Sequence, residues 1–409
     1  MSEEKLVPKL RFNDFDDEWS TYKLSELSEQ VKRKKENITD KDNILTISAN
    51  KGFISQKERW DNVIAGKSLK KYTYLKKDEF SYNRGNSKSF KYGCIYRLNY
   101  ENALVPNVYH SFRITNGDIN FFEQLFQSKQ LDKQLIKIIT STARMDGLLN
   151  ISANNFFNID VNIPNNLKEQ KLIGDFLKLI DIKIELLENK YENYLNFKKY
   201  IMQQIFTQKL RFRNFNENFN EYLISQLFIS KKGSGLSKDM IENDGVNKCV
   251  LYGELYTNYS EIISEVQSRT NEECKSLSKY GDILIPSSTT TKGIDLVTAS
   301  VILDDDDVYL GGDITILRNK DDSIVNNSYF AYYFSNGLIK DVSRLTQGST
   351  IIHLYWKDFK KVKVMLPSLE EQEKITNILI SIDEKLNEIN NIIDSMKEFK
   401  KGLLQQMFV

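Results

Sequence analysis

Two stretches of this chain repeat apolar residues every seven positions, with charged residues between them. In the first stretch, the two predicted seam positions are Ile173, Ile180, Leu187, Tyr194, Ile201 and Leu177, Ile184, Tyr191, Lys198, Ile205. In the second stretch, they are Ile375, Ile382, Ile389, Met396, Leu403 and Leu379, Leu386, Ile393, Lys400, Met407. Such a sustained repeat predicts a coiled-coil helix rather than a generic amphipathic one. Each helix is expected to run roughly 55–60 Å at about 1.5 Å per residue.

The two helical stretches match each other residue by residue. The matches, each 202 residues apart, include Glu169/Glu371, Gln170/Gln372, Asp181/Asp383, Phe197/Phe399, Lys198/Lys400 and Gln203-Gln204/Gln405-Gln406. A second match lies 200 residues apart, where Lys9-Leu10-Arg11-Phe12 recurs as Lys209-Leu210-Arg211-Phe212. These matches predict a tandem duplication whose flanks stayed alike while the regions between them diverged. The arrangement favours two equivalent helical supports that carry two unlike domains.

An isolated helix of this kind leaves its apolar seam in water, so the two helices are expected to pack on each other. A pseudo-twofold axis across them would make the pair antiparallel. Lys198 and Lys400, at equivalent seam positions, would then help to set the register. The alternative is a pair of unconnected helical hairpins.

Before each helix, short runs of β-branched and aromatic residues alternate with Gly and Asn, which predicts mixed, strand-rich structure. In the first region these runs are 45–47, 94–96 and 111–114, followed by a helical pattern over 121–139. In the second they are 249–251, 282–285 and 314–317, followed by a helix near 328–335. Each region closes on a strand that ends in proline, Pro164 or Pro367, and this is a helix-start signal when an acidic residue follows.

We therefore predict an α+β chain, with two β-rich mixed domains and two long helices that form an antiparallel coiled coil. The predicted boundaries are 1–162 for the N-terminal domain, 163–208 for the first helix, 209–366 for the C-terminal domain and 367–409 for the second helix.

The composition is that of a globular protein, with 40% apolar and 28% charged residues in 409. Three cysteines, Cys94, Cys249 and Cys274, lack CxxC spacing, which argues against a zinc cluster or a disulfide framework. A reduced, cytoplasmic setting is expected. The first residues are acidic without an apolar signal core, and no run of about 18 apolar residues is present to span a membrane.

Charge is distributed unevenly between the two diverged regions. Residues 22–160 carry a net charge of +8, whereas residues 222–362 carry −4 and include an acidic run at 304–307. The first region therefore has a cationic surplus suited to phosphates. The second lacks one, so the two halves are not expected to grip a nucleic acid in the same way.

Motifs typical of enzymes are missing from the sequence. It contains no GxxxxGK[ST] and no GxGxxG after a strand, and its two histidines, His110 and His353, exclude HExxH and His-rich metal sites. No nucleophile-elbow motif supports a Ser-His-Asp triad, and no Asn/Asp-Pro-Pro-aromatic tetrapeptide occurs. We therefore expect no catalytic residue and no metal site in this chain.

Polar loops with glycine remain as candidate contacts to nucleic acid. In the first region the candidates are Arg84, Asn86, Ser87, Lys88, Lys91, Tyr92 and Arg144. In the second region they are Lys231, Lys232, Ser287, Ser288, Thr289, Thr290, Thr291, Lys292 and His353. Arginine can bind guanine and asparagine adenine through two hydrogen bonds, while lysine and hydroxyl groups suit phosphate oxygens. The alternative for each of them is a residue of a solvated loop.

The duplicated flanks resemble the specificity subunit of type I restriction-modification systems, usually called HsdS. The residues that carry the resemblance are Pro164, Leu167, Glu169, Gln170, Ile180 and Asp181, their counterparts Pro367, Leu369, Glu371, Gln372, Ile382 and Asp383, and the Gln-Gln pairs. The resemblance covers the whole order of variable region, helix, variable region and helix. It implies two target recognition domains, each reading one half of a bipartite DNA sequence, and a pair of helices that sets the separation of the half-sites.

The resemblance also implies partners. Two methyltransferase subunits would dock on the helices and carry S-adenosylmethionine for methylation of adenine N6. Restriction subunits would add translocation and cleavage with ATP and Mg²⁺, so this chain itself would need no cofactor. Two other hypotheses compete: a coiled-coil scaffold whose domains bind proteins, and an undetected nuclease or methyltransferase.

Overall fold

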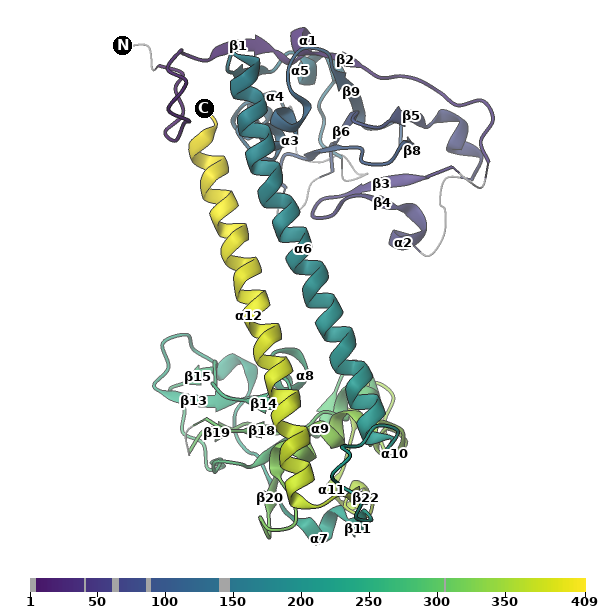
Figure 1. Cartoon of the computed structure of the whole chain (residues 1–409), viewed down its shortest axis with the longest axis vertical. Helices are drawn as coiled ribbons and strands as arrows, with labels where there is room; N and C mark the ends of the chain where they lie inside the picture. The colour runs from purple at the N-terminus through teal and green to yellow at the C-terminus, as the bar shows by residue number, and fades with distance from the viewer. Residues whose placement is uncertain (1–4, 40–41, 61–65, 86–89, 140–147, 305–306) are drawn as a thin grey trace. The chain divides into compact units, whose positions relative to one another are not determined.

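The computed structural model describes residues 5–39, 42–60, 66–85, 90–139, 148–304 and 307–409. The chain divides into two compact units (Figure 1). The first comprises Met1–Asn189 and Asn391–Val409, and the second comprises Lys190–Asn390. Two long helices, α6 (Leu167–Phe206) and α12 (Leu369–Met407), each begin in one unit and end in the other. No helix among the described residues is long and apolar enough to cross a membrane.

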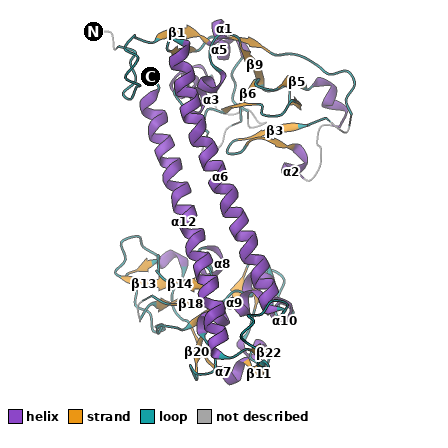
Figure 2. Cartoon of the chain, viewed as in Figure 1, coloured by secondary structure: helices purple, strands orange, loops and turns teal. Residues whose placement is uncertain are grey.

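The domain of the first unit consists of short strands and short helices (Figure 2). Its strands are β1 (Ser20–Lys23), β2 (Ser28–Gln30), β3 (Leu45–Ser48), β4 (Gly52–Ser55), β5 (Thr73–Lys76), β6 (Phe80–Asn83), β7 (Cys94–Arg97), β8 (Asn102–Val105), β9 (His110–Ile114) and β10 (Asp160–Ile163). Its helices are α1 (Leu24–Leu27), α2 (Gln56–Trp60), α3 (Ile119–Gln127), α4 (Asp132–Ile138) and α5 (Ala153–Phe157), with a 3₁₀ turn at Gly66–Lys71.

The domain of the second unit follows a related order. Its strands are β11 (Asn220–Leu223), β12 (Phe228–Lys232), β13 (Asn247–Val250), β14 (Ile262–Ile263), β15 (Arg269–Thr270), β16 (Ile283–Pro286), β17 (Ser288–Thr289), β18 (Ser300–Ile302), β19 (Tyr309–Leu310), β20 (Ile314–Asn319), β21 (Ile352–His353) and β22 (Lys363–Leu366). Its helices are α7 (Ile224–Leu227), α8 (Glu254–Thr257), α9 (Asn327–Asn336), α10 (Ile339–Ser343) and α11 (Trp356–Phe359), with 3₁₀ turns at Lys238–Met240 and Gly293–Leu296.

The same sheet arrangement occurs in both domains. The strand order β2-β9-β6 of the first sheet corresponds to β12-β20-β16 of the second, and a helix, α3 or α9, follows the last of these strands in sequence. A two-stranded antiparallel ribbon closes each domain, β1 with β10 and β11 with β22. The ribbons bring the start and the end of each domain together directly before a long helix. The sheets around this shared frame differ between the domains, as the divergence of the sequence predicts.

The repeated Glu-Gln pair at the start of each long helix attaches the domain to it. Arg11 donates from Nε to Glu169 at 2.7 Å, and Arg211 donates from NH2 to Glu371 at 2.8 Å. Both glutamates are 1% exposed. The hydrogen bond to Glu169 raises the pKa of the Arg11 guanidinium, which therefore stays charged. The repeated Lys-Leu-Arg-Phe segment is thus held against the repeated helix start.

The glutamine after each of these glutamates holds the loop that leads into a short helix of the domain, α3 or α9. The Gln170 side chain accepts a hydrogen bond from the backbone N–H of Asp118 at 2.9 Å, and Gln372 accepts one from Asn326 at 2.9 Å. Asp118 and Asn326 are the N-cap residues of α3 and α9. Each glutamine therefore links a domain to the long helix through a capped helix start.

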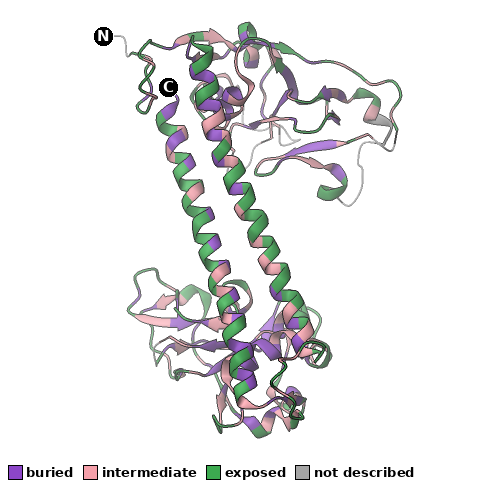
Figure 3. Ribbon diagram, viewed as in Figure 1, coloured by how far each residue is buried: buried purple, intermediate pink, exposed green. Residues whose placement is uncertain are grey.

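Within each unit, segments of α6 and α12 pair in antiparallel orientation. Glu188 is ion-paired with Lys397 in the first unit, so a position late in one segment meets a position early in the other. Buried residues recur along one face of each helix, and exposed residues recur along the other (Figure 3). The predicted seam residues that are buried are Ile173, Leu177, Ile180, Ile184, Lys198, Ile205, Ile375, Leu379, Ile382, Leu386, Ile389, Ile393, Lys400, Leu403 and Met407. The remaining predicted seam residues, Leu187, Tyr191, Tyr194, Ile201 and Met396, are half-buried.

The two seam lysines make equivalent ion pairs across the helices. In the first unit, Lys400 Nζ lies 2.5 Å from Asp181 Oδ1 and 2.7 Å from Gln127 Oε1. In the second, Lys198 Nζ lies 2.7 Å from Asp383 Oδ1 and 3.0 Å from Glu261 Oε2. Each lysine thus bonds to the other long helix and to the domain. One difference stands out: Lys198 meets two carboxylates, whereas Lys400 meets one carboxylate and an amide.

Electrostatics keeps the buried Lys198 charged. Burial lowers the pKa of its ammonium, but the charges of Glu261 and Asp383 more than offset that effect, and the pKa lies above its usual value. The Tyr332 hydroxyl donates a hydrogen bond to Asp383 at 2.5 Å. In the first unit, the Gln124 side-chain amide donates to Asp181 at 2.7 Å.

The structure differs from the predicted helix over 121–139. Two helices, α3 and α4, replace it, with Lys129 between them at a positive φ of 62°. Ser128 ends α3 with a hydrogen bond from its hydroxyl to the carbonyl of Leu125 at 2.6 Å. The break allows Gln127 to reach Lys400 while Leu131 and Leu135 enter the core of the domain.

We predict unequal effects of removing the two lysines. Lys198→Met leaves Asp383 and Glu261 facing each other without a cation. It should therefore lower the free energy of unfolding by about 3–5 kcal/mol. Lys400→Met leaves a single carboxylate that retains the Gln124 amide, and it should cost less. The measurement is urea unfolding followed by tryptophan fluorescence, with Trp356 reporting on the second unit and Trp19 and Trp60 on the first.

A triple variant serves as the control for packing. Lys198→Met combined with Asp383→Asn and Glu261→Gln removes the uncompensated charges and should recover most of the lost stability. An equal loss of unfolding free energy in Lys198→Met and Lys400→Met would contradict the unequal electrostatic roles assigned to the two lysines.

Candidate nucleic-acid interface

In the first domain, two of the candidate loops lie side by side. The loop after β6 contacts the segment near residue 148 through a bridge between Gly85 and Leu148. Arg84 is fixed between them, because its side chain donates to the carbonyls of Val108 at 3.0 Å and Ile151 at 3.2 Å. The fold therefore brings together the loop that carries the Arg84 cluster and the segment that precedes the closing strand.

The other candidates of the first domain are placed differently. Lys91 is exposed, and Tyr92 is half-buried with its carbonyl accepting from the Tyr82 hydroxyl at 2.6 Å. Asn86, Ser87, Lys88 and Arg144 lie outside the described residues.

The second domain has an equivalent pair of loops. The strand β17, directly after β16, pairs with β21, so that Ser288 lies opposite His353 and Thr289 opposite Ile352. The His353 ring stacks on Tyr355 with centroids 5.5 Å apart. Both domains thus pair the loop after a central strand with a segment close to the end of the domain.

Most of the predicted hydroxyl run in the second domain bonds internally. Ser287, Ser288 and Thr289 are buried; Ser287 bonds to Thr315 at 2.7 Å, and Ser288 donates to Asp313 at 2.8 Å. The exposed residues of the run are Thr290, Thr291 and Lys292. The part of the run open to a ligand is therefore its second half.

Lys231 and Lys232 are exposed at the end of β12, where the fold adds two cations that the sequence did not single out. Lys275 and Lys279, from a distant loop, line the same groove as the two strand lysines. No local pattern links the two pairs, because they meet only through the tertiary fold. The only signal for this groove in the sequence was the Lys231-Lys232 pair at the end of a strand, and that pair identified one side of the groove.

The first domain carries a cationic run at the corresponding place, directly after β2. In this run Arg33 is ion-paired with Glu79, and Lys35 with Asp42. Lys34 donates to the carbonyl of Lys71. Much of the cationic surplus next to this strand is therefore compensated within the domain.

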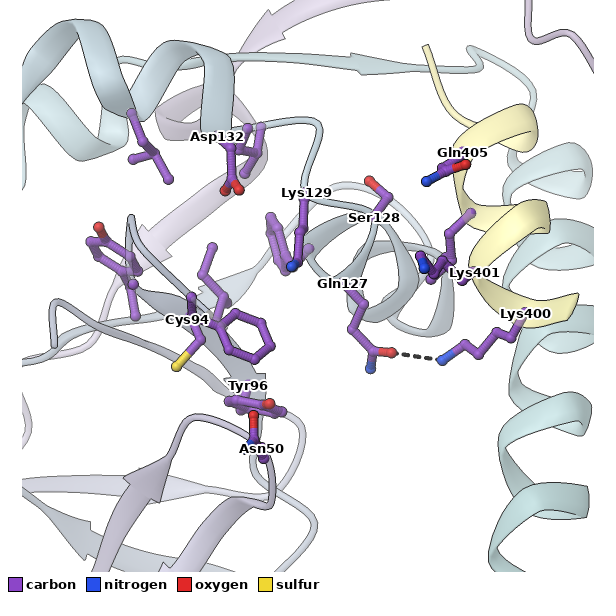
Figure 4. Close-up of a pocket in the computed structure, with 18 of the residues that line it drawn as sticks. Asn50, Cys94, Tyr96, Gln127, Ser128, Lys129, Asp132, Lys400, Lys401 and Gln405 are labelled. Atoms are coloured by element: carbon purple, nitrogen blue, oxygen red, sulfur yellow. Dashed lines mark hydrogen bonds between the residues drawn. The ribbon is translucent and has the colours of Figure 1, made fainter. Parts of the chain in front are cut away.

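A cavity of about 410 Å³ lies in the first unit between the α3–α4 turn and the last turns of α12 (Figure 4). The hydrogen bond between Lys400 and Gln127 crosses one side of it. Burial raises the pKa of the Cys94 thiol to about 12 and also raises that of Asp132. A thiol held protonated is a poor nucleophile. The lining residues come from the domain and from α12, so the cavity lies at the joint between them.

Among the described residues, no cluster of three or more His, Cys, Asp and Glu side chains could hold a metal ion. His110 is buried against the carbonyl of Ile151, 3.2 Å from its Nε2, and burial lowers its pKa. The ring is thus part of the core that holds the Arg84 loop.

Residues 216–396 match the family model described as the type I restriction modification DNA specificity domain. The type I restriction enzyme MjaVIII specificity subunit of Methanocaldococcus jannaschii is 38% identical over 63 residues, 15% of each chain. A putative type I restriction enzyme specificity subunit of Haemophilus influenzae is 30% identical over 113 residues, 27% of this chain and 26% of the relative. A putative type I specificity subunit of Mycoplasma pneumoniae is 24% identical over 206 residues, 49% of this chain and 48% of the relative. The matches thus span about half or less of each relative.

Two solved structures share the fold over nearly the whole chain. The type I restriction-modification S subunit from M. genitalium has a TM-score of 0.61 at 17% identity, covering 98% of this chain and 99% of that one. A chain from a structure described as showing complex assembly and conformational transition of the type I R-M system has a TM-score of 0.53 at 12% identity, covering 95% and 97%. The family match in the second half and the shared fold across both halves agree with the resemblance found in the duplicated flanks. Residues 216–396 of this chain thus form a type I restriction modification DNA specificity domain by similarity, and the whole chain shares the fold of the solved S subunit.

Proposed function

We propose that this chain selects the DNA sequence on which a type I restriction-modification complex acts, without a catalytic step of its own. Each domain reads one half of a bipartite target. The observation that carries the proposal is the repeated attachment of two unlike domains to the same positions of two paired helices, through Glu169 and Gln170 and through Glu371 and Gln372. Equivalent supports with different surfaces suit two readers of different sequences.

The paired helices set the separation of the half-sites. Each helix begins in one unit and ends in the other, and the ion pairs of Lys198 and Lys400 permit one register within each unit. Two short half-sites held at a defined separation multiply discrimination without one large interface.

The exposed face of α6 supports docking of a methyltransferase subunit. Leu172, Leu179 and Leu186 repeat every seven residues and are 40%, 64% and 62% exposed. A stripe of exposed leucines at heptad spacing suits a partner helix. The proposal includes two such subunits, which bring S-adenosylmethionine, and restriction subunits, which bring ATP and Mg²⁺.

A selection experiment tests the proposal and separates it from a protein-binding scaffold. The complex of this chain with its methyltransferase should enrich one bipartite motif from random duplex DNA. Replacing residues 222–362 with the corresponding segment of another specificity subunit should change one half of the motif and leave the other half intact. Enrichment of no motif would favour the scaffold, and loss of both halves would show that the domains do not read independently.

Shortening both helices tests the role of the helices in spacing. Removing residues 187–193 and 388–394 takes one heptad from each helix between the two lysine–aspartate pairs, so both pairs can still form and Leu186 of the docking face is kept. The loss of about 10 Å should shorten the selected spacer by about three base pairs. The control removes the heptad from α6 alone, which offsets the pairs and should abolish selection. An unchanged spacer in the double deletion would refute the role of the helices in setting the separation of the half-sites.

Polar substitutions on α6 test the docking face. Changing Leu172, Leu179 and Leu186 to serine should weaken methyltransferase binding about 1,000-fold or more, because about 1.5 kcal/mol or more is lost per leucine that docking would bury. The matched control changes three exposed apolar residues outside the long helices, Val246, Ile294 and Ile351, to serine. Binding is measured by calorimetry, and equal affinities for the two variants would place the partner elsewhere.

A further inference from the structure

A groove of about 340 Å³ in the second domain gathers cations from three separate segments. Lys231 and Lys232 come from the end of β12, Lys275 and Lys279 from the loop before β16, and Arg318 from β20. Asp307 is the acidic residue in the lining. Five cations thus line one groove of a region whose net charge is −4.

The four lysines are available to a ligand. All of them are exposed, and none forms a side-chain ion pair within the part of the chain that the structure describes. Two other cations are compensated: Lys248 pairs with Asp304 at 2.7 Å, and Arg318, in the groove lining, pairs with the buried Asp282 at 2.5 Å. The groove therefore concentrates positive potential, which Asp307 in its lining offsets only in part.

The walls of the groove are held in place before any ligand binds. The strand β12 pairs with β20 from Phe228 to Lys232. The opposite wall is fastened to it, because the Ser276 hydroxyl donates to the carbonyl of Lys232 at 3.1 Å. Ser278 adds a hydrogen bond from its backbone N–H to the carbonyl of Val308 at 2.9 Å. Flexible ammonium groups thus project from a fixed frame, which lowers the ordering cost of binding.

We propose that this groove holds the phosphate backbone of duplex DNA and supplies the main affinity of the second domain, while other loops of the domain read the bases. The inference rests on the proposed function, because it assumes that the second domain meets DNA. Lysine ammonium groups act as point charges and suit phosphate oxygens, whereas sequence reading needs fixed donors and acceptors at base edges. Four lysines in one groove suit the repeated negative charges of a phosphate backbone.

The acidic remainder of the domain strengthens this assignment. Carboxylates elsewhere on the surface repel a phosphate backbone, so the cationic groove defines the favoured approach of the duplex. Asp307, exposed in the lining of the groove, weakens the field there and limits the affinity. Removing its charge should therefore tighten binding.

The test uses the full chain in complex with its methyltransferase and measures binding to a random-sequence duplex over a salt series. Changing Lys231, Lys232, Lys275 and Lys279 to glutamine should weaken binding about 10- to 100-fold and lower the slope of log K against log salt by about two to four. Asp307→Asn should tighten binding. A matched control changes the exposed Lys238, Lys340, Lys357 and Lys361 of the same domain to glutamine, which removes equal charge and should have a much smaller effect.

The result separates this inference from the proposed function. In the selection experiment, the groove variant should still enrich the wild-type motif at higher protein concentration, because base reading is intact. Affinity and salt slope unchanged from wild type would overturn the groove assignment and leave the two-reader proposal standing. A groove variant that lost affinity but selected a different motif would also overturn it, since the lysines would then read bases. If wild type enriched no motif, the proposed function would fail independently of the groove.

Discussion

A buried ammonium group constrains each end of the paired helices. Removing a charged lysine from water costs several kcal/mol unless a carboxylate meets it, so Lys198 requires Asp383, and Lys400 requires Asp181. Sliding one helix past the other by a heptad would separate each lysine from its aspartate. Because the third partner, Glu261 or Gln127, comes from the adjacent domain, the same contact that fixes the register also fixes the domain on its helix.

This arrangement explains how unlike domains occupy equivalent positions. Three contacts attach a domain to the long helices: an arginine pairs with the glutamate, a capped helix start bonds to the glutamine, and a polar group bonds to the lysine. The two domains make the last contact with different residues, Gln127 at Lys400 and Glu261 at Lys198. The sheets beyond these contacts can then diverge without loss of attachment.

The helices and the order of domains were predictable because their signals are local or repeated. Heptad spacing is visible along one stretch of sequence, and the duplication doubles each signal. The break at Lys129 was missed because the pattern over 121–139 is uniformly helical, and the advantage of a break comes from a distant partner, Lys400. The hydroxyl run at Ser287–Thr289 suggested a surface loop, yet an adjacent strand buries it, and composition alone cannot distinguish the two outcomes.

The groove of the second domain could not be predicted from the sequence, for a related reason. Net charge averages over a domain, whereas a phosphate responds to the few charges within roughly a Debye length, about 8 Å at physiological salt. An acidic domain can therefore attract DNA strongly at one place if its carboxylates are paired or face elsewhere, as Asp282 and Asp304 are paired here. Such a domain also gains orientation, because repulsion everywhere else disfavours misplaced binding. The negative charge of the second domain, which at first argued against DNA, is then part of what directs the duplex to the groove.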